Sequence, residues 1–106
     1  MSERYVRVVT LWVHKGQEAA FDAFEREAAR IMARHKGRID QAVRMTPADG
    51  AGPNDATPYE IHIVSFPDKA SAEAYAADPA TLALREKRDR IISRTVLMAG
   101  REAGPY

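Results

Sequence analysis

Apolar runs alternate along the chain with segments of helical periodicity. Residues Tyr5 to Val13 (YVRVVTLWV) are rich in β-branched and aromatic side chains, which predicts a strand buried on both faces. After Gly16 the apolar positions recur every 3.6 residues, which predicts an amphipathic helix from Gln17 to Lys36. The helix is expected to end at Gly37, because a C-cap favours a residue that tolerates positive φ. Its apolar face consists of Phe21, Phe24, Ala28, Ile31, Met32 and His35, and its opposite face carries Glu18, Glu25, Arg26 and Arg30.

Two more strands are predicted in the middle of the chain, Arg38 to Met45 and Tyr59 to Phe66. Alternation in the first of them places Ile39, Val43 and Met45 on one side, and Asp40 and Arg44 on the other. The segment between the strands, Thr46 to Pro58, contains three prolines and two glycines. We expect it to be a mobile loop that borders a ligand cleft or the rim of a dimer.

The last third of the chain carries specific helix-start signals. Asp68 can cap a second helix, and Asp78 followed by Pro79 is typical of a helical restart. The faces predicted to be buried hold Ala72, Tyr75 and Ala76, and then Leu84, Arg88, Ile91 and Ile92. A short strand from Thr95 to Ala99 and a frayed tail complete the chain.

This order, β-α-β-β-α-β, is that of the ferredoxin-like α+β fold. We therefore expect residues 1–106 to form one domain with an ordered core of about residues 5–99: a four-stranded antiparallel sheet with helices on one face and the first and third strands in the centre. The first strand is apolar on both sides, with Val6, Val8 and Trp12 on one and Val9, Leu11 and Val13 on the other. An uncovered sheet would then expose a large apolar patch, so we expect a homodimer that packs sheet against sheet.

Composition excludes several classes of function. Sixteen basic and fifteen acidic residues leave a formal charge of +1, which gives no electrostatic reason to expect nucleic acid or an anionic membrane as partner. The absence of cysteine excludes disulfides, thiolate nucleophiles and cysteine-based metal sites. No apolar run reaches membrane-spanning length and the first residues do not resemble a signal peptide, so we expect a soluble cytoplasmic protein.

Several short motifs resemble the dimeric α/β-barrel superfamily, which includes antibiotic-biosynthesis monooxygenases, haem-degrading oxygenases and muconolactone isomerases. The matching residues, within about residues 5–99, are Leu11-Trp12-Val13 before Gly16, Phe21 and Phe24, Phe66-Pro67, Ala72, Tyr75 and Asp78-Pro79. The resemblance, strongest to an uncharacterised branch, implies sheets packed into a dimeric barrel and a cleft between sheet and helices. Two oxygenase signatures are absent: Val64 and Phe66 replace a Glu-x-Trp pattern, and Leu84 and Arg85 stand where haem-degrading members place a histidine.

His62 is the sharpest catalytic candidate. It lies in mid-strand and shares its parity with Glu60, which could orient the imidazole as a general base. The resemblance places this face under the helices, whereas hydrophobicity favours Ile61 and Ile63 there, so both orientations remain open. A purely structural, hydrogen-bonded histidine is the alternative role.

The remaining candidates would bind rather than react. Arg88 and Arg44 could each hold a carboxylate bidentately, or could snorkel or pair with Glu60 or Asp40. Trp12 could form a pocket wall, although aromatic residues on central strands more often belong to a core, and Phe66 joins the candidate ligand-binding set. The spacing of His14, His35 and His62 matches no metal motif, so we expect no metal site.

These observations favour a cofactor-independent enzyme, oxygenase- or isomerase-like, that acts on a small organic molecule in a cleft between sheet and helices. A non-catalytic dimeric module for ligand binding or structure is the alternative, and haem binding through one axial histidine is a third possibility. The sequence names neither the substrate nor the reaction.

Overall fold

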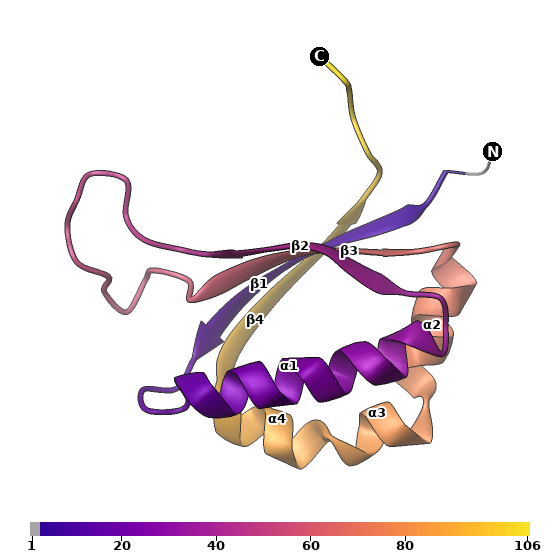
Figure 1. Ribbon diagram of the computed structural model, residues 1–106, viewed down its shortest axis with the longest axis horizontal. Helices are drawn as coiled ribbons and strands as arrows, with labels where there is room; N and C mark the ends of the chain where they lie inside the picture. The colour runs from indigo at the N-terminus through magenta and orange to yellow at the C-terminus, as the bar shows by residue number, and fades with distance from the viewer. Residues whose placement is uncertain (1–2) are drawn as a thin grey trace.

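A computed structural model describes residues 3–106 and confirms the ferredoxin-like α+β fold. The elements are β1 (Tyr5–Val13), α1 (Glu18–Ala33), β2 (Arg38–Arg44), β3 (Glu60–Phe66), α2 (Lys69–Ala77), α3 (Pro79–Ala83), α4 (Arg85–Ile91) and β4 (Ile92–Gly100) (Figure 1). The second helical region is therefore divided into three short helices. The last strand is longer than predicted because Ile92 already belongs to it.

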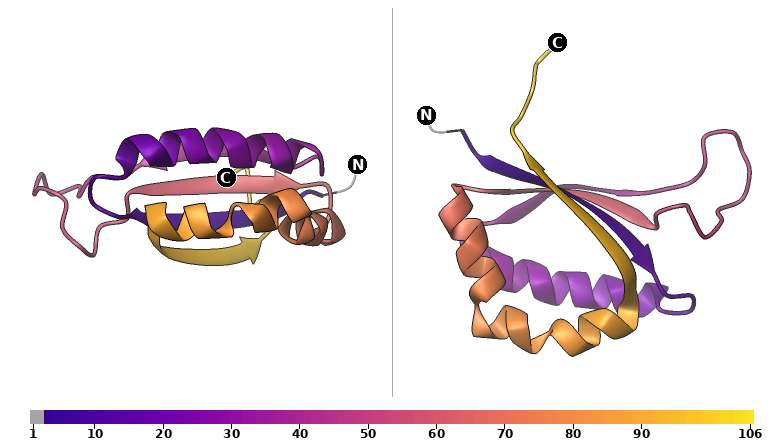
Figure 2. Two further views of the ribbon diagram at one scale, coloured as in Figure 1. Left: turned by 90° about the horizontal axis from the view of Figure 1, so that it is seen from below. Right: turned by 180° about the vertical axis from the view of Figure 1, so that it is seen from behind.

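The four strands form an antiparallel sheet in the order β2-β3-β1-β4. The two most apolar strands, β1 and β3, take the central positions, as predicted. All the helices lie beneath one face of this sheet, with α1 beside the α3–α4 segment, and the other face has no covering layer (Figures 1 and 2). Within residues 3–106, no helix is long and apolar enough to cross a membrane.

The core lies between the helices and the sheet. Its two clusters of buried side chains are Leu11, Phe21, Phe24, Ala28, Ile91 and Ile92, and Met32, Val64, Phe66 and Ala72. Burial of each large apolar side chain contributes roughly 1.5–3 kcal/mol. The predicted apolar face of α1 is thus buried except at His35, which is half-exposed.

Two helix starts have the predicted caps. The carboxylate of Asp68 accepts a hydrogen bond from the backbone N–H of Ser71 at 2.7 Å and begins α2. Asp78 accepts one from the backbone N–H of Ala80 at 2.8 Å and begins α3, with Pro79 at the first helical position. These side chains satisfy amide groups that a helix leaves without partners in its first turn.

The end of α1 differs from the prediction. The helix stops at Ala33, and the residue with positive φ is Lys36 (60°), whereas Gly37 does not adopt positive φ. Gly37 is instead required for space: a Cβ atom there would lie 2.5 Å from Met32 Cγ and 2.7 Å from Phe66 Cδ1. A close approach of backbone to core, not a left-handed turn, explains this glycine.

A β-bulge in β2 overturns the predicted alternation of that strand. Ile39 pairs with Val64 and Gln41 pairs with Ile63, so Asp40 has no partner position on β3. The extra residue turns Ile39 toward the helices and Val43 toward the open face, where Val43 is 42% exposed. They therefore lie on opposite sides, and Met45 already lies beyond the strand.

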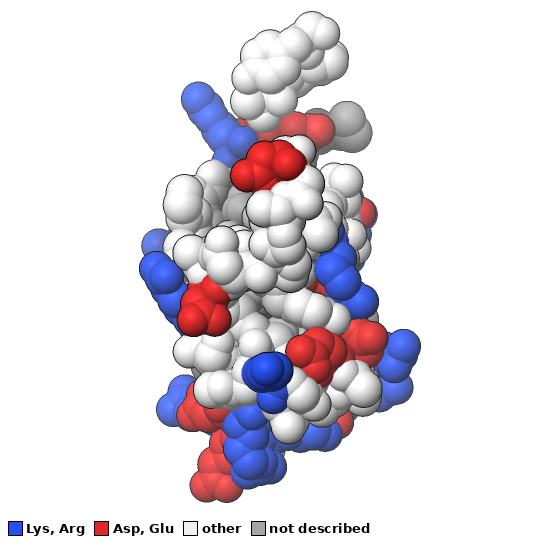
Figure 3. Space-filling view, turned by 90° about the vertical axis from the view of Figure 1, so that its left-hand side faces the viewer, with Lys and Arg blue, Asp and Glu red and all other residues white. Residues whose placement is uncertain are grey.

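The open face of the sheet is largely apolar. The strand register places Val6, Val8, Trp12, Val43, Val96 and Met98 on it. Trp12 packs against the guanidinium of Arg94 and donates a hydrogen bond from Nε1 to the carbonyl of Ala56 at 3.3 Å. The segment from Thr46 to Pro58 is a loop without helix or strand, as predicted, and through this hydrogen bond it contacts the open face. Figure 3 views the molecule from the loop side, where mostly uncharged residues lie above a mixture of both charges near the helices.

Candidate functional site

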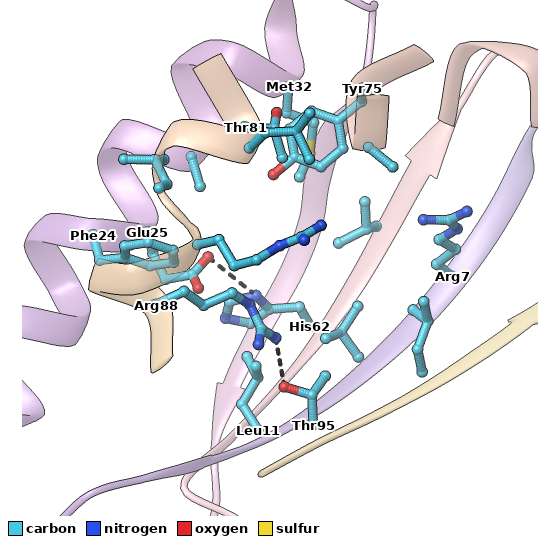
Figure 4. Close-up of a pocket in the computed structure, with 18 of the residues that line it drawn as sticks. Arg7, Leu11, Phe24, Glu25, Met32, His62, Tyr75, Thr81, Arg88 and Thr95 are labelled. Carbon is cyan, nitrogen blue, oxygen red and sulfur yellow. Dashed lines mark hydrogen bonds and ion pairs between the residues drawn. The ribbon is translucent and has the colours of Figure 1, made fainter. Parts of the chain in front are cut away.

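A cavity of about 440 Å³ lies between the sheet and the helices (Figure 4). Strands β1, β3 and β4 and all four helices contribute to its lining. The walls are mostly apolar, and a few polar side chains converge on the interior. This size and composition are typical of sites for small organic molecules.

The structure decides which way His62 faces. The register pairs His62 with Val9 and Glu60 with Leu11, on the face covered by the helices. The imidazole is only 3% exposed and lines the cavity. The orientation implied by the superfamily resemblance is thus confirmed, and the one favoured by hydrophobicity is wrong. A polar ring can be buried here because it has a hydrogen-bond partner.

That partner is Glu60, which is itself fixed by an arginine. Nε2 of His62 lies 2.5 Å from Oε2 of Glu60, and Oε1 of Glu60 accepts hydrogen bonds from Nε and Nη2 of Arg44 at 3.1 and 2.8 Å. Arg44 also donates to Asp22 at 3.0 Å, and the hydrogen bond to Glu60 raises the pKa of its guanidinium. Because a carboxylate paired with a guanidinium acts as acceptor, Nε2 of His62 carries the proton and Nδ1 is the basic nitrogen.

A second carboxyl group faces that basic nitrogen. Oε2 of Glu25, from α1, lies 3.8 Å from Nδ1 of His62, and both residues line the cavity (Figure 4). Burial raises the pKa of Glu25; His62 and Arg88 act in the opposite direction, and Glu60 acts in the same one. Sequence reasoning placed Glu25 on the polar face of the helix, which is wrong. The signal was available, because Glu25 follows Phe21 by four residues and precedes Ala28 by three.

Of the two arginines expected to bind an anion, only Arg88 reaches the cavity. Its Nη2 donates to Oγ1 of Thr95 at 2.5 Å, beside His62 (Figure 4). Arg44 takes the alternative role, since it pairs with Glu60 and is absent from the lining. Two arginines that the sequence did not indicate as anion ligands, Arg7 and Arg85, also line the cavity.

The two aromatic candidates lie on opposite faces of the sheet. Phe66 is 1% exposed and lines the cavity. Trp12 lies on the open face of the sheet, so it is not a wall of this cavity, because side chains alternate between the faces of β1. Tyr75 and Thr81 were missed, and both lie at the opposite end of the cavity from Arg88 and Thr95 (Figure 4). Burial raises the pKa of Tyr75.

Acidic and histidine side chains also bear on metal binding. Within the described residues, no three His, Asp or Glu side chains are grouped so that they could hold a metal ion. In the Glu60–His62–Glu25 group, Glu60 is hydrogen-bonded to His62, and Glu25 faces the other ring nitrogen at 3.8 Å. Such a group can accept and return a proton at a cavity wall.

Comparison with known proteins identifies solved structures that have a similar fold. No family model and no curated protein matches the chain. A solved protein of unknown function from Rhodopseudomonas palustris is similar at a TM-score of 0.80, with 14% identity over 99% of this chain and 86% of that one. A dabb family protein with a ferredoxin-like fold from Mesorhizobium loti matches at a TM-score of 0.64, with 15% identity over 97% of this chain and 100% of that one.

A third solved protein, from Nitrosomonas europaea, carries a name that proposes an antibiotic biosynthesis monooxygenase. It matches at a TM-score of 0.65, with 18% identity over 100% of this chain and 94% of that one. At such identities the similarity shows a shared fold, and one fold hosts many reactions. The chain therefore shares the ferredoxin-like fold of these solved proteins.

Proposed function

We propose that the cavity binds a compact organic molecule and that His62 acts on it as a general base, without a bound cofactor. One observation carries this proposal: the buried imidazole has its Nε2 held by Glu60, which Arg44 holds in turn, and it turns Nδ1 toward a carboxyl group at the cavity wall. A histidine with a purely structural role needs a partner but no adjoining cavity. The fixed tautomer is what a general base requires.

The step that this geometry favours is the transfer of a proton within the substrate. Nδ1 of His62 removes a proton from a carbon acid, and the electron pair remains on the substrate as an enolate near the Arg88 guanidinium. The imidazolium then lies between Glu60 and Glu25 and returns its proton to a different atom. This sequence is an isomerisation, which consumes no oxidant. An oxygenase route would begin with the same proton removal but would require dioxygen.

The test is to substitute His62 and follow proton exchange. Wild-type protein is incubated in D₂O with carbonyl compounds selected by thermal shift, and loss of the C–H signal is followed by NMR. We expect His62→Asn to slow the exchange by about 10²- to 10⁴-fold. The matched control is His14→Asn, because His14 is exposed and outside the cavity. If His62→Asn is folded and exchanges at the wild-type rate, His62 is not the base.

We also infer that two copies of the chain pair through the open faces of their sheets. Support comes from the uncovered apolar side chains, among which Val43 is 42% and Met98 is 62% exposed. Monomeric domains rarely leave such a face in water. A two-fold pairing covers the same patch on both copies, which fits a surface that is apolar along β1 and β4. The non-catalytic alternative would keep this dimer and lose only the proton chemistry.

A further inference from the structure

We propose that the cavity selects an organic anion: a carboxylate held by Arg88, joined through an uncharged body to a hydroxyl or carbonyl group that bonds to Thr81. This inference rests on the proposed function, because it names the substrate class for the same cavity. It goes further by assigning the two ends of that cavity to different chemical groups.

The cavity lining carries an excess of positive charge. Three guanidinium groups line it, those of Arg7, Arg85 and Arg88, against the two carboxyl groups of Glu25 and Asp89. Burial raises the pKa of Glu25, which weakens the negative contribution further. A cationic substrate would face repulsion here, whereas an anion would be attracted.

The three arginines of the cavity have no acidic partner. In the part of the chain that the structure describes, no carboxylate oxygen lies within 4.0 Å of Arg7, Arg85 or Arg88. Outside the cavity, Arg38 pairs with Asp40 at 2.5 Å and Arg44 with Glu60 at 2.8 Å. A partly buried guanidinium gains from a charged acceptor, and its fork matches a carboxylate in two hydrogen bonds.

The opposite end of the cavity offers a neutral polar contact. Oγ1 of Thr81 is buried and has no hydrogen-bond partner among the described residues. Thr81 lies with Tyr75 away from Arg88 and Thr95, and His62 lies at the end that holds Arg88 (Figure 4). Buried hydroxyl groups are nearly always hydrogen-bonded, so this atom points to a polar group of the ligand.

Between these ends the walls are apolar, with Val64, Phe66 and Met32. A ligand that fills about 440 Å³ would place its carboxylate near Arg88, on the same side of the cavity as His62, and its neutral polar group near Thr81. The reacting carbon would then lie near the carboxylate end of the molecule. Binding energy at both ends would hold it in position.

The experiment measures the binding of three matched probes, 4-hydroxybenzoate, benzoate and benzyl alcohol, by titration calorimetry. We expect affinity to fall in that order. Arg88→Met should weaken benzoate binding by about tenfold or more, because a charge-assisted hydrogen bond is lost. Arg38→Met, which removes an arginine outside the cavity, should leave binding unchanged. Thr81→Val should lower the affinity for 4-hydroxybenzoate to that for benzoate.

Several outcomes would overturn the inference: benzyl alcohol that binds as tightly as benzoate, no saturable binding of either acid, or benzoate affinity unchanged in Arg88→Met. Should Arg88→Met fail to fold, Arg88→Lys keeps the charge and should bind benzoate more weakly than wild type. Binding of these acids, together with no proton exchange in any carbonyl compound that binds, upholds this inference and overturns the proposed function. Turnover of a neutral substrate alone, abolished by His62→Asn, does the reverse.

Discussion

Replacement of Gly37 by alanine tests how tightly the cavity wall is packed. The new methyl carbon would lie 2.5 Å from Met32 Cγ and 2.7 Å from Phe66 Cδ1. Both neighbours are buried, at 7% and 1% exposure, so neither can move into solvent. The substitution therefore forces the core to rearrange.

Two effects oppose each other in this substitution. An overfilled core costs about 1–3 kcal/mol. Alanine also restricts the unfolded chain more than glycine does, which stabilises the fold by about 0.4–1 kcal/mol. The steric cost is the larger, so we expect a net loss of about 1–2 kcal/mol. For a domain of this size, that corresponds to a fall in Tm of roughly 4–16 °C.

The assay is urea-induced unfolding followed by circular dichroism. Gly52→Ala is the matched control, because no atom lies within 4 Å of a Cβ there and its φ is not positive. The combination of Gly37→Ala with Met32→Ala should cost less than the sum of the two single changes, since the smaller side chain makes room. If Gly37→Ala is as stable as Gly52→Ala, the packing argument is wrong.

Three other substitutions test separate features. Asp78 accepts hydrogen bonds from His35 Nε2 at 2.7 Å and from the N–H of Ala80, which lower the pKa of its carboxyl group below 3.8. The ionised carboxylate therefore stabilises the fold above pH 3.8, and this stabilisation is lost as pH falls through the lowered pKa. The difference in stability between wild type and Asp78→Asn, measured by urea unfolding, should shrink in acid, and a constant difference would contradict this. Burial raises the pKa of Glu25 above 4.5, so the folded state favours the protonated carboxyl group and loses stability as pH rises through the raised value. The stability of Glu25→Gln relative to wild type should therefore increase over that range. A difference in melting temperature that does not depend on pH would refute this expectation. Trp12→Asp should convert a dimer of about 24 kDa into the 11.8 kDa chain, because an unpaired carboxylate costs several kcal/mol to bury. Light scattering measures the mass of both proteins. A variant that stays dimeric would place Trp12 outside the interface.

The parts of the fold that depend on local sequence were predictable. Asp68 and Asp78 mark helix starts through bonds to amides two or three residues away, so the sequence contains both partners. The apolar runs of β1 and β3 likewise lie within short stretches of sequence, and they indicated that these strands are the central ones. The bulge at Asp40 was not predictable, because the extra residue exists only relative to the pairing with β3.

The candidate site was predictable in part. His62 and Glu60 share a strand and a parity, so their proximity followed from the sequence alone. Which face they occupy did not follow, because the burial of His62 depends on Arg44, sixteen residues before Glu60, to hold the carboxylate. Glu25 and Arg7 come from elements far apart in sequence, and only the packed layers place them around one cavity.

The bulge in β2 gives that strand one residue more than its pairing with β3 requires. Ile39 and Arg44 keep their partners, Val64 and Glu60, although five steps along β2 match four along β3. A deletion of Asp40 would remove the unpaired residue and leave both pairs in register. The same loss within β3 would turn every following side chain to the other face. Natural variants of this fold should therefore tolerate a missing residue in β2 while they retain the arginine that holds Glu60.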